Sequence, residues 1–284
     1  MNIVKTISDV RHHVLLARSV GKTIGLVPTM GALHEGHASL IDAAAGQCDY
    51  VVVSIFVNPT QFGPNEDFDQ YPRDLDSDAR LCQNHDADLI FAPDVGEMYP
   101  DKLCTTVTVD SIIDCLCGKF RPGHFAGVTT VCAKLFGIVC PDSVFFGQKD
   151  AQQVAVIKKM ASDLNMPFQI VSCPTVRDSD GLALSSRNRY LTDSQRQQAL
   201  HISRALFSCQ DLVRSGTRDT STLLHQINDI LTSAPDIEVQ YAEIVHPDTL
   251  VRLDTVTDRA LAAIAVFLGQ TRLIDNIIID LNNL

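Results

Sequence analysis

The feature that most constrains the fold is the apolar run at residues 50–57, YVVVSIFV. Apolar side chains at successive positions cover both faces of a strand, which is typical of a parallel sheet with helices packed on each side. Strand-like and helix-like segments alternate around this run through the first half of the chain, which predicts a doubly wound α/β domain. The strand candidates are 23–28, 50–57, 87–92, 143–146 and 168–176, and the helix candidates are 38–47, 128–139 and 151–165.

The pattern changes after about Arg187. Thr192 is a suitable N-cap for a long amphipathic helix, and a second helix is expected at 221–232. Three strand candidates follow, and Gly269-Gln270 between the last two is typical of a tight hairpin turn. We therefore predict an N-terminal domain at 1–176 and a smaller α+β domain at 177–284 that closes over the site. The strand candidates are 238–245, 260–268 and 272–279.

Composition narrows the class of protein. The 284 residues are 45% apolar, enough for a real core, and no apolar run approaches the ~20 residues that span a bilayer. The N-terminus lacks the charged-then-apolar plan of a signal peptide, so we expect a cytoplasmic protein without a membrane partner. The formal net charge is −11 and no basic face is evident, which argues against binding to a nucleic-acid backbone.

The chain contains nine cysteines, but their spacing predicts no metal site. Cys115 and Cys117 form a CxC pair, there is no CxxC motif, and no Cys/His cluster has zinc-like spacing. We expect free thiols that pack as small apolar residues.

The stretch from residue 24 to residue 37, IGLVPTMGALHEGH, predicts a site for phosphate. A strand leads into a glycine turn, and His34 and His37 follow at positions i and i+3 at the start of a helix. Helical geometry places both imidazoles on one side, beside free backbone N–H groups and the positive end of the helix dipole. Two surface histidines near a helix start are the alternative, but the preceding strand and turn favour the functional interpretation.

Four further polar stretches carry candidate site residues, and each is expected to follow a strand candidate. Because ligands bind at the carboxyl ends of strands in such sheets, the stretches should share one cleft. A lysine at a helix start suits a phosphate, and Asp150 could cap that helix, orient Lys149, or bind a nucleotide or metal. Two serines and Arg187 could grip pyrophosphate oxygens. The stretches are NPTQFG at 58–63, KFRPGHFAG at 119–127, FFGQKDAQQ at 145–153 and RDSDGLALSSRN at 177–188.

Together these motifs resemble the pantoate–β-alanine ligase family, within the HxGH nucleotidyltransferase superfamily. The resemblance extends from Val27 to the segment 273–276, and five motifs occur in the expected order. It implies a Rossmann-like N-terminal domain and ATP-dependent condensation of (R)-pantoate with β-alanine through a pantoyl adenylate, releasing AMP and pyrophosphate. It also implies Mg²⁺ with ATP, held mostly by phosphates and water, and a homodimer.

The resemblance also assigns site residues. Gln61 and Gln153 are expected to bind pantoate, and Gln61 also β-alanine. The expected catalytic residues are His34, His37, Lys149, Ser185, Ser186 and Arg187. The expected ATP-binding residues are Met30, Gly31, Ala32, Leu33, His34, Glu35, Gly36, His37, Gly147, Gln148, Lys149, Asp150, Val176, Leu184, Ser185, Ser186 and Arg187.

Three other functions share parts of this pattern. Another HxGH-type adenylyltransferase would act on a different small anionic substrate. A tRNA synthetase would need a tRNA-binding domain or basic surface, neither of which is visible. A silent nucleotide-binding module would have little need of the complete polar set. The C-terminal domain is the candidate for closure, but which of its segments acts as a lid, and how activity is regulated, are not predicted.

Overall fold

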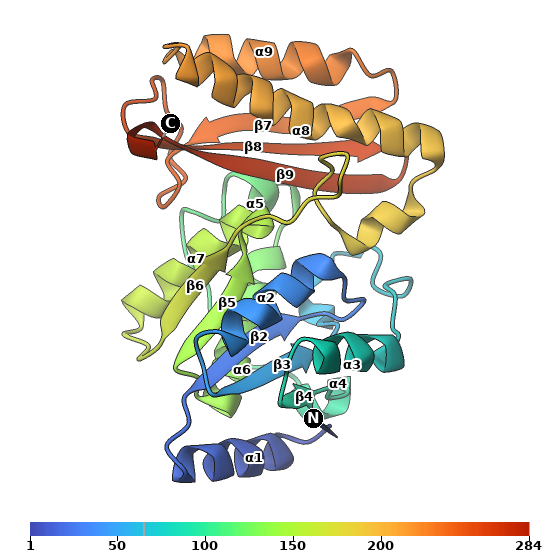
Figure 1. Cartoon of the computed structure of the whole chain (residues 1–284), viewed down its shortest axis with the longest axis vertical. Helices are drawn as coiled ribbons and strands as arrows, with labels where there is room; N and C mark the ends of the chain where they lie inside the picture. The colour runs from blue at the N-terminus through green and yellow to red at the C-terminus, as the bar shows by residue number, and fades with distance from the viewer. Residues whose placement is uncertain (65, 284) are drawn as a thin grey trace.

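A parallel sheet of six strands forms the centre of the N-terminal half, in a computed structural model that describes residues 1–64 and 66–283. The strand order is β1-β4-β3-β2-β5-β6, with β2 and β3 in the centre, so the chain winds outward in both directions (Figure 1). All neighbouring pairs in this sheet are parallel. The strands are β1 (Asn2–Val4), β2 (Ile24–Thr29), β3 (Tyr50–Ile55), β4 (Leu89–Phe91), β5 (Ser143–Gly147) and β6 (Gln169–Cys173).

Helices cover both faces of this sheet. In β3, Val51 and Val53 pack in one core cluster with α2 and α3, whereas Val52 packs in another with α1, α6 and α7. The alternation follows from the two-residue period of a strand. The predicted doubly wound fold is therefore confirmed. The helices are α1 (Ile7–Ser19), α2 (Glu35–Ala45), α3 (Leu75–Asn84), α4 (Val95–Met98), α5 (Leu116–Phe120), α6 (His124–Val139) and α7 (Ala151–Asp163).

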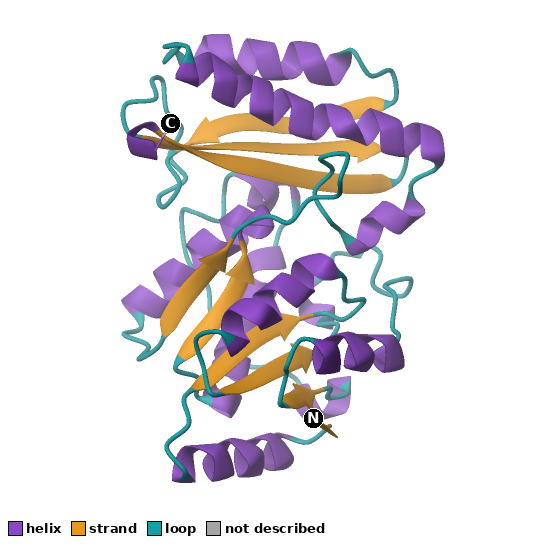
Figure 2. Cartoon of the chain, viewed as in Figure 1, coloured by secondary structure: helices purple, strands orange, loops and turns teal. Residues whose placement is uncertain are grey.

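The C-terminal part is an antiparallel sheet under two helices (Figure 2). Thr192 caps α8 through a capping box, as predicted, and the β8–β9 hairpin turns at Gly269-Gln270, where Gly269 has a φ of +59°. Alternate residues of β8 face opposite ways: Ile264 packs under α8 and α9, whereas Ala263 joins the core of the N-terminal half. The elements are α8 (Asp193–Arg214), α9 (Thr220–Thr232), β7 (Ile237–Val245), β8 (Arg259–Leu268) and β9 (Thr271–Asp280).

Two sequence-based expectations need correction or extension. The stretch 119–127 does not follow a strand: it begins in the last turn of helix α5 and reaches the cleft through the start of α6. The elements β1, α1, α3, α4 and α5 were not predicted from the sequence. Helix α1 buries only Val10, Val14 and Ala17 and leaves Leu15 and Leu16 largely exposed, so its apolar periodicity is weak. In the described part of the chain, no helix combines the length and apolar character needed to cross a bilayer.

Candidate active site

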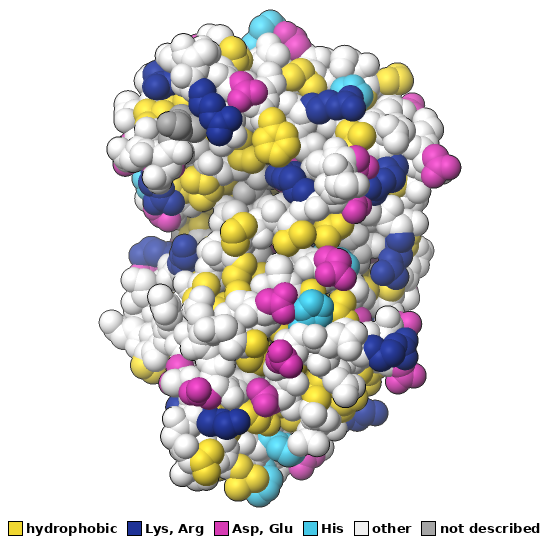
Figure 3. All heavy atoms as spheres, viewed as in Figure 1, with side chains coloured by type: hydrophobic (Ala, Val, Ile, Leu, Met, Phe, Trp, Pro, Cys, Tyr) yellow, Lys and Arg dark blue, Asp and Glu magenta, His cyan; other side chains and the backbone are white. Residues whose placement is uncertain are grey.

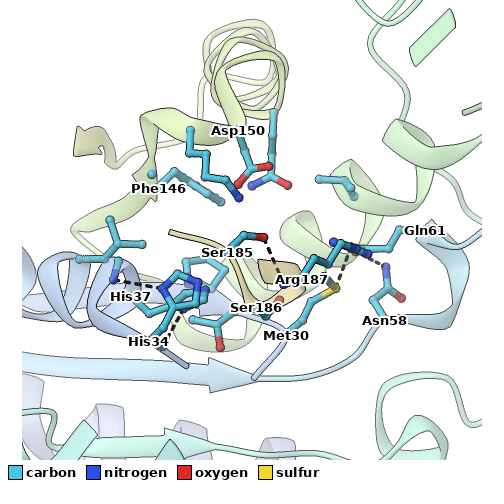
Figure 4. A pocket seen from close by; sticks show the side chains of 18 of the residues that line it. Met30, His34, His37, Asn58, Gln61, Phe146, Asp150, Ser185, Ser186 and Arg187 are labelled. Atoms are coloured by element: carbon cyan, nitrogen blue, oxygen red, sulfur yellow. Dashed lines mark hydrogen bonds between the residues drawn. The ribbon is translucent and has the colours of Figure 1, made fainter. Parts of the chain in front are cut away.

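A cavity of about 240 Å³ opens at the carboxyl ends of β2, β3, β5 and β6, as expected for a doubly wound sheet. Figure 4 shows the predicted histidines, Gln61 and the Ser185–Arg187 loop around it. The cavity is lined by Pro28, Thr29, Met30, His34, Gly36, His37, Leu40, Phe56, Asn58, Gln61, Phe62, Tyr71, Arg121, His124, Val128, Val131, Cys132, Leu135, Phe146, Gly147, Lys149, Asp150, Gln153, Pro174, Thr175, Val176, Leu184, Ser185, Ser186 and Arg187.

His34 and His37 form a capping box at the start of α2, and this fixes the orientation of both rings. The backbone N–H of Gly36 donates to His34 Nδ1 (3.1 Å), and the N–H of His34 donates to His37 Nδ1 (3.4 Å). Because both Nδ1 atoms accept, each neutral ring carries its proton on Nε2. The ring centroids lie 4.2 Å apart, so the pair provides two neighbouring N–H donors.

Burial keeps these imidazoles neutral. Burial, together with the nearby Lys149 charge, lowers the pKa of His37 to about 3 and that of His34 to about 4. At neutral pH the rings are therefore uncharged donors. A phosphate group bound beside the rings would favour their protonated forms. The pair can therefore stabilise negative charge that increases during a reaction.

These lowered pKa values predict acid lability. An unfolded histidine titrates near 6.5, so between about pH 6.5 and 4 the unfolded chain binds protons that the folded chain excludes. Above pH 6.5 these histidines do not reduce the free energy of unfolding. As the pH falls from 6.5 toward 4, the free energy of unfolding decreases. We expect His37→Asn to reduce the loss of unfolding free energy between pH 7 and pH 5 by about 1–2 kcal/mol in urea titrations.

The control for this measurement is His225→Asn, because the His225 side chain is 80% exposed. It should show the wild-type loss between the two pH values. An equal loss in wild type and His37→Asn would mean that His37 is not held neutral by the fold.

The turn before His34 is held by a buried carboxylate. Gly31 and Ala32 have φ values of +81° and +52°, and the N–H groups of Ala32 and Leu33 donate to Asp78 of α3 at 3.0 and 2.7 Å. The Asp78 side chain is buried and satisfies both donors. Helix α3 therefore sets the position from which His34 enters the cavity.

Lys149 is positioned by the C-terminal sheet. It lies in a 3₁₀ turn, Gln148–Asp150, between β5 and α7. The Asn276 amide of β9 donates to the backbone carbonyls of Gln148 (3.0 Å) and Lys149 (2.8 Å). Asp150 makes no capping hydrogen bond to α7, and its side chain lines the cavity instead. Of the roles considered for Asp150, helix capping is therefore the one that the structure contradicts.

The serine loop follows β6 and carries a half-buried arginine. Ser185 accepts a hydrogen bond from the N–H of Arg187 (3.3 Å), and Ser186 is buried. The Arg187 guanidinium donates to both oxygens of Asp67, from Nε at 3.1 Å and Nη2 at 2.8 Å, and lies 5.8 Å from the Tyr71 ring centre. Burial opposes the charge, but Asp67 raises the pKa of Arg187, which keeps it a cation.

Buried amides line the opposite part of the cavity. Asn58 is 1% exposed, and its amide donates to Gln61 Oε1 (3.1 Å) and to the Gly127 carbonyl (3.2 Å). Tyr99 donates its hydroxyl to Asn58 Oδ1 (2.8 Å). The Gln61 amide points at Met30 Sδ, a weak acceptor, at 3.0 Å. A substrate oxygen would be a better partner for this amide.

Most of the predicted site residues line this one cavity, but five of them do not. Gly31, Ala32 and Leu33 form the turn anchored by Asp78, and Glu35 is exposed at the start of α2. Gln148 points toward the sheet junction, where it accepts from Ser172 and donates to Asn276. These five residues belong to the turns that support the cavity instead of lining it, so their ATP-binding role remains a prediction based on backbone position.

Other residues at the cavity had no assigned role from sequence. Arg121 and His124 lie in the stretch 119–127, whose cations and histidine in a Gly/Pro loop could have indicated a role. Phe146 also lies in one of the named stretches, at 145–153, whereas Tyr71 joins the lining from a loop whose composition is ordinary. Asp67 and Asp78 act through pairings 120 and 45–46 residues away in sequence, and nothing in the local pattern indicates these.

The fold and cavity define a nucleotide-binding α/β enzyme of the HxGH type. Its paired histidines cap a helix after a central strand of the doubly wound core, facing a lysine and a Ser-Ser-Arg loop. The sequence model of the pantoate-β-alanine ligase family matches residues 2–278. The chain belongs to the pantoate–β-alanine ligase family, and its activity is pantoate–β-alanine ligation.

Individual relatives agree over nearly the whole chain. A pantothenate synthetase of Thermoanaerobacter sp. (strain X514) is 57% identical over 278 residues, 98% of each chain. The crystal structure of pantothenate synthetase from Thermus thermophilus superposes with a TM-score of 0.92 at 41% identity, covering 98% of this chain and 99% of that one. The ligase from Francisella tularensis, complexed with β-γ ATP and β-alanine, gives a TM-score of 0.77 at 36% identity, covering 98% and 97%.

Proposed function

We propose that the chain performs this ligation in two steps inside the cavity, first activating pantoate with ATP and then joining it to β-alanine. The observation that carries the proposal is the shared lining: phosphate-binding groups from three distant segments face buried amides in one space. A simple nucleotide pocket would not need the amide side. Charged groups suit the triphosphate, and neutral amides suit a small hydroxy acid.

In the first step, a pantoate carboxylate oxygen attacks the α-phosphorus of ATP. A P–O bond to pantoate forms, the bond to the β-phosphate oxygen breaks, and pyrophosphate leaves. We assign His34 and His37 to the α-phosphate oxygens through their Nε2–H groups, with His37 as proton donor or charge stabiliser. Lys149, Ser185, Ser186 and Arg187 would hold the departing pyrophosphate. Fixed donors that follow developing charge are the main source of catalysis in phosphoryl transfer.

In the second step, the neutral amine of β-alanine attacks the acyl carbon of pantoyl adenylate. The C–N bond forms, the C–O bond to AMP breaks, and the amine loses a proton to AMP or solvent. Gln61 and Gln153 would orient pantoate through its hydroxyl and carbonyl oxygens in both steps, and Gln61 would also contact β-alanine. Their amides add no full charge that would weaken the pantoate nucleophile.

The nucleotide substrate is proposed to be MgATP. Among residues 1–64 and 66–283, no three His, Cys, Asp or Glu side chains form a cluster able to hold a metal. Triphosphate oxygens and water suffice for Mg²⁺, with Asp150 as the nearby carboxylate of the cavity. Met30, Gly147, Val176 and Leu184 are proposed to enclose the adenosine.

Product analysis tests this function. The protein is incubated with ATP, Mg²⁺, pantoate and β-alanine, and the nucleotide product is identified. We expect AMP and pyrophosphate in amounts equal to pantothenate, and none when pantoate is omitted. ADP as the product would contradict adenylate chemistry, and adenylylation of pantoate without amide formation would indicate a plain adenylyltransferase.

Gln61 provides a substrate-specific prediction. We expect Gln61→Ala to raise the dissociation constant of pantoate by roughly 10- to 100-fold, because it removes a buried hydrogen-bonding partner, while MgATP binding changes little. Isothermal titration calorimetry with each ligand measures this directly. Gln70→Ala is the control, because Gln70 is exposed and does not line the cavity. Loss of ATP binding in Gln61→Ala would contradict the assignment.

Three further proposals concern the organisation of the protein. We propose that residues 1–176 form the ATP- and pantoate-binding domain and that 177–284 form the domain that closes over the site. This is supported by Asn276, which contacts the Lys149 turn from the C-terminal sheet. We also propose a homodimer, as the family resemblance implies, and a cytoplasmic location, which the sequence pattern of the N-terminus favours. On the face drawn in Figure 3, cationic and acidic side chains are interspersed.

A further inference from the structure

Arg121 and His124 form a rigid unit with the 3₁₀ turn Pro59–Gln61, here called the amide turn. Helix α6 begins at His124, after Gly123 with a φ of +82°. At Gly127 a Cβ atom would lie 2.4 Å from the Thr60 carbonyl oxygen, so the first turn of α6 packs directly on the backbone of the amide turn. The position of Arg121 is thus tied to that of Gln61.

Hydrogen bonds define the protonation state of this unit. His124 Nδ1 lies 2.8 Å from the Gln61 carbonyl oxygen, and His124 Nε2 lies 3.0 Å from Arg121 Nη1. Both contacts are satisfied only when Nδ1 donates and Nε2 accepts, which requires the neutral ring. Burial and the Arg121 charge lower the pKa of His124 to about 4, in agreement. Arg121 is therefore the positive charge of the unit.

In the structure, the Arg121 fork binds a carboxylate. Its Nε donates to Glu66 Oε1 at 2.7 Å and its Nη2 to Glu66 Oε2, a bidentate arrangement. The two side chains are only 19% and 26% exposed. The same part of the chain supplies Asp67 to Arg187. Arg121 is thus a preformed carboxylate receptor at the cavity wall, and a protein carboxylate occupies it.

The chemistry of the two acids decides which substrate this receptor suits. The pantoate carboxylate is the nucleophile of the first step, so a bidentate arginine would withdraw the electrons that it must donate. The β-alanine carboxylate stays ionised and unreacted throughout, while the amine at the other end of the molecule reacts. A strong charge-assisted contact therefore favours binding and orientation of β-alanine, whereas it would reduce the nucleophilicity of the pantoate carboxylate.

The location of Arg121 agrees with this choice. A smaller cavity of about 50 Å³ adjoins the larger one, and the residues that line both are Arg121, His124, Lys149, Asp150 and Gln153. His34 and Arg187 line the larger cavity but not the smaller. Arg121 is held on the amide side of the site by His124, which contacts both Arg121 and the Gln61 carbonyl, and the acyl group of pantoate is proposed to lie on this side.

We propose that Arg121 binds the carboxylate of β-alanine, positioned by His124, and that Glu66 holds this place until the substrate displaces it. The inference rests on the proposed ligation and adds the residue that recognises the acid end of the amine substrate.

Steady-state and half-reaction kinetics of Arg121→Gln test the proposal. We expect the KM for β-alanine to rise by roughly 10- to 100-fold, the loss of one charged hydrogen-bonded contact, with KM values for ATP and pantoate within about twofold. Pantoate-dependent exchange of pyrophosphate into ATP, which needs no β-alanine, should keep its rate. Lys119→Gln is the matched control, since it removes an exposed cation from the same motif and does not line either cavity.

Slower exchange in Arg121→Gln would place Arg121 at the triphosphate and overturn the proposal. An unchanged KM for β-alanine would do the same. Absence of exchange in the wild-type protein would instead contradict the ligation itself, so the two failures are distinguishable.

Two further measurements separate recognition from a general structural effect. The wild type should prefer β-alanine over its neutral carboxamide as acceptor by roughly 10- to 100-fold in kcat/KM, and Arg121→Gln should lose this preference. Glu66→Gln weakens the internal competitor and should lower the KM for β-alanine. The replacement of Glu66 by the β-alanine carboxylate on Arg121 would be contradicted if Arg121→Gln kept the preference for β-alanine over its carboxamide. A raised KM for β-alanine in Glu66→Gln would contradict it as well.

Discussion

Replacing Lys149 with alanine is expected to lower the rate of pantoate-dependent pyrophosphate–ATP exchange by roughly 10²–10³-fold, the usual cost of removing one fixed donor from a developing charge. Lys149 lines the cavity opposite the histidine pair, and its backbone is held by Asn276. The loss should appear mainly in kcat, because the charge on the departing pyrophosphate grows only as the reaction proceeds.

Lys158→Ala is the control for this measurement. Lys158 is an exposed lysine of α7 that does not line the cavity, so its removal should leave the exchange rate within about twofold, as expected for a surface substitution. A Lys149→Ala enzyme that exchanges pyrophosphate at a rate close to the wild type would mean that the triphosphate lies elsewhere.

Asp275→Asn is expected to lower the unfolding free energy by about 3 kcal/mol, because it leaves a guanidinium that is only 17% exposed without its counter-charge. Arg177 Nη1 and Nη2 donate to the two Asp275 oxygens at 2.6 and 3.0 Å, and the Asp275 side chain is only 3% exposed. The pair joins the segment that leaves the parallel sheet to β9 of the antiparallel sheet. Urea unfolding at pH 7 measures the loss.

A surface pair provides the comparison for Asp275. Asp211 and Arg214 form an ion pair on α8 with side chains 71% and 53% exposed, so Asp211→Asn should cost less than about 1 kcal/mol. Equal effects of the two substitutions would show that the Arg177–Asp275 pair does not hold the two sheets together.

The parts of the fold that the sequence predicted are those with a strong local pattern. The run at residues 50–57 is apolar on both faces because helices cover both sides of β3, and the hairpin after β8 uses a glycine that adopts a positive φ. Helix α1 was not predicted because it buries only one narrow stripe. Local periodicity reports burial, so elements with little burial give little signal.

The site divides in the same way. His34, His37, Lys149 and Ser186 lie in short motifs next to strand ends, and topology alone brings them to one edge of the sheet. The carboxylates that set the site could not be predicted, because Glu66, Asp67 and Asp78 meet partners 45 to 120 residues away. The sequence around a charged residue does not identify a partner that lies far away in the chain.

We propose that the cavity directs the pantoate carboxylate to the α-phosphorus of ATP. Ligation with pantoate labelled with ¹⁸O in both carboxylate oxygens, followed by mass spectrometry of the products, reports which phosphorus is attacked. We expect one ¹⁸O in AMP and one in pantothenate for each amide formed. Unlabelled AMP formed together with pantothenate, or label recovered in pyrophosphate or inorganic phosphate, would contradict attack at the α-phosphorus.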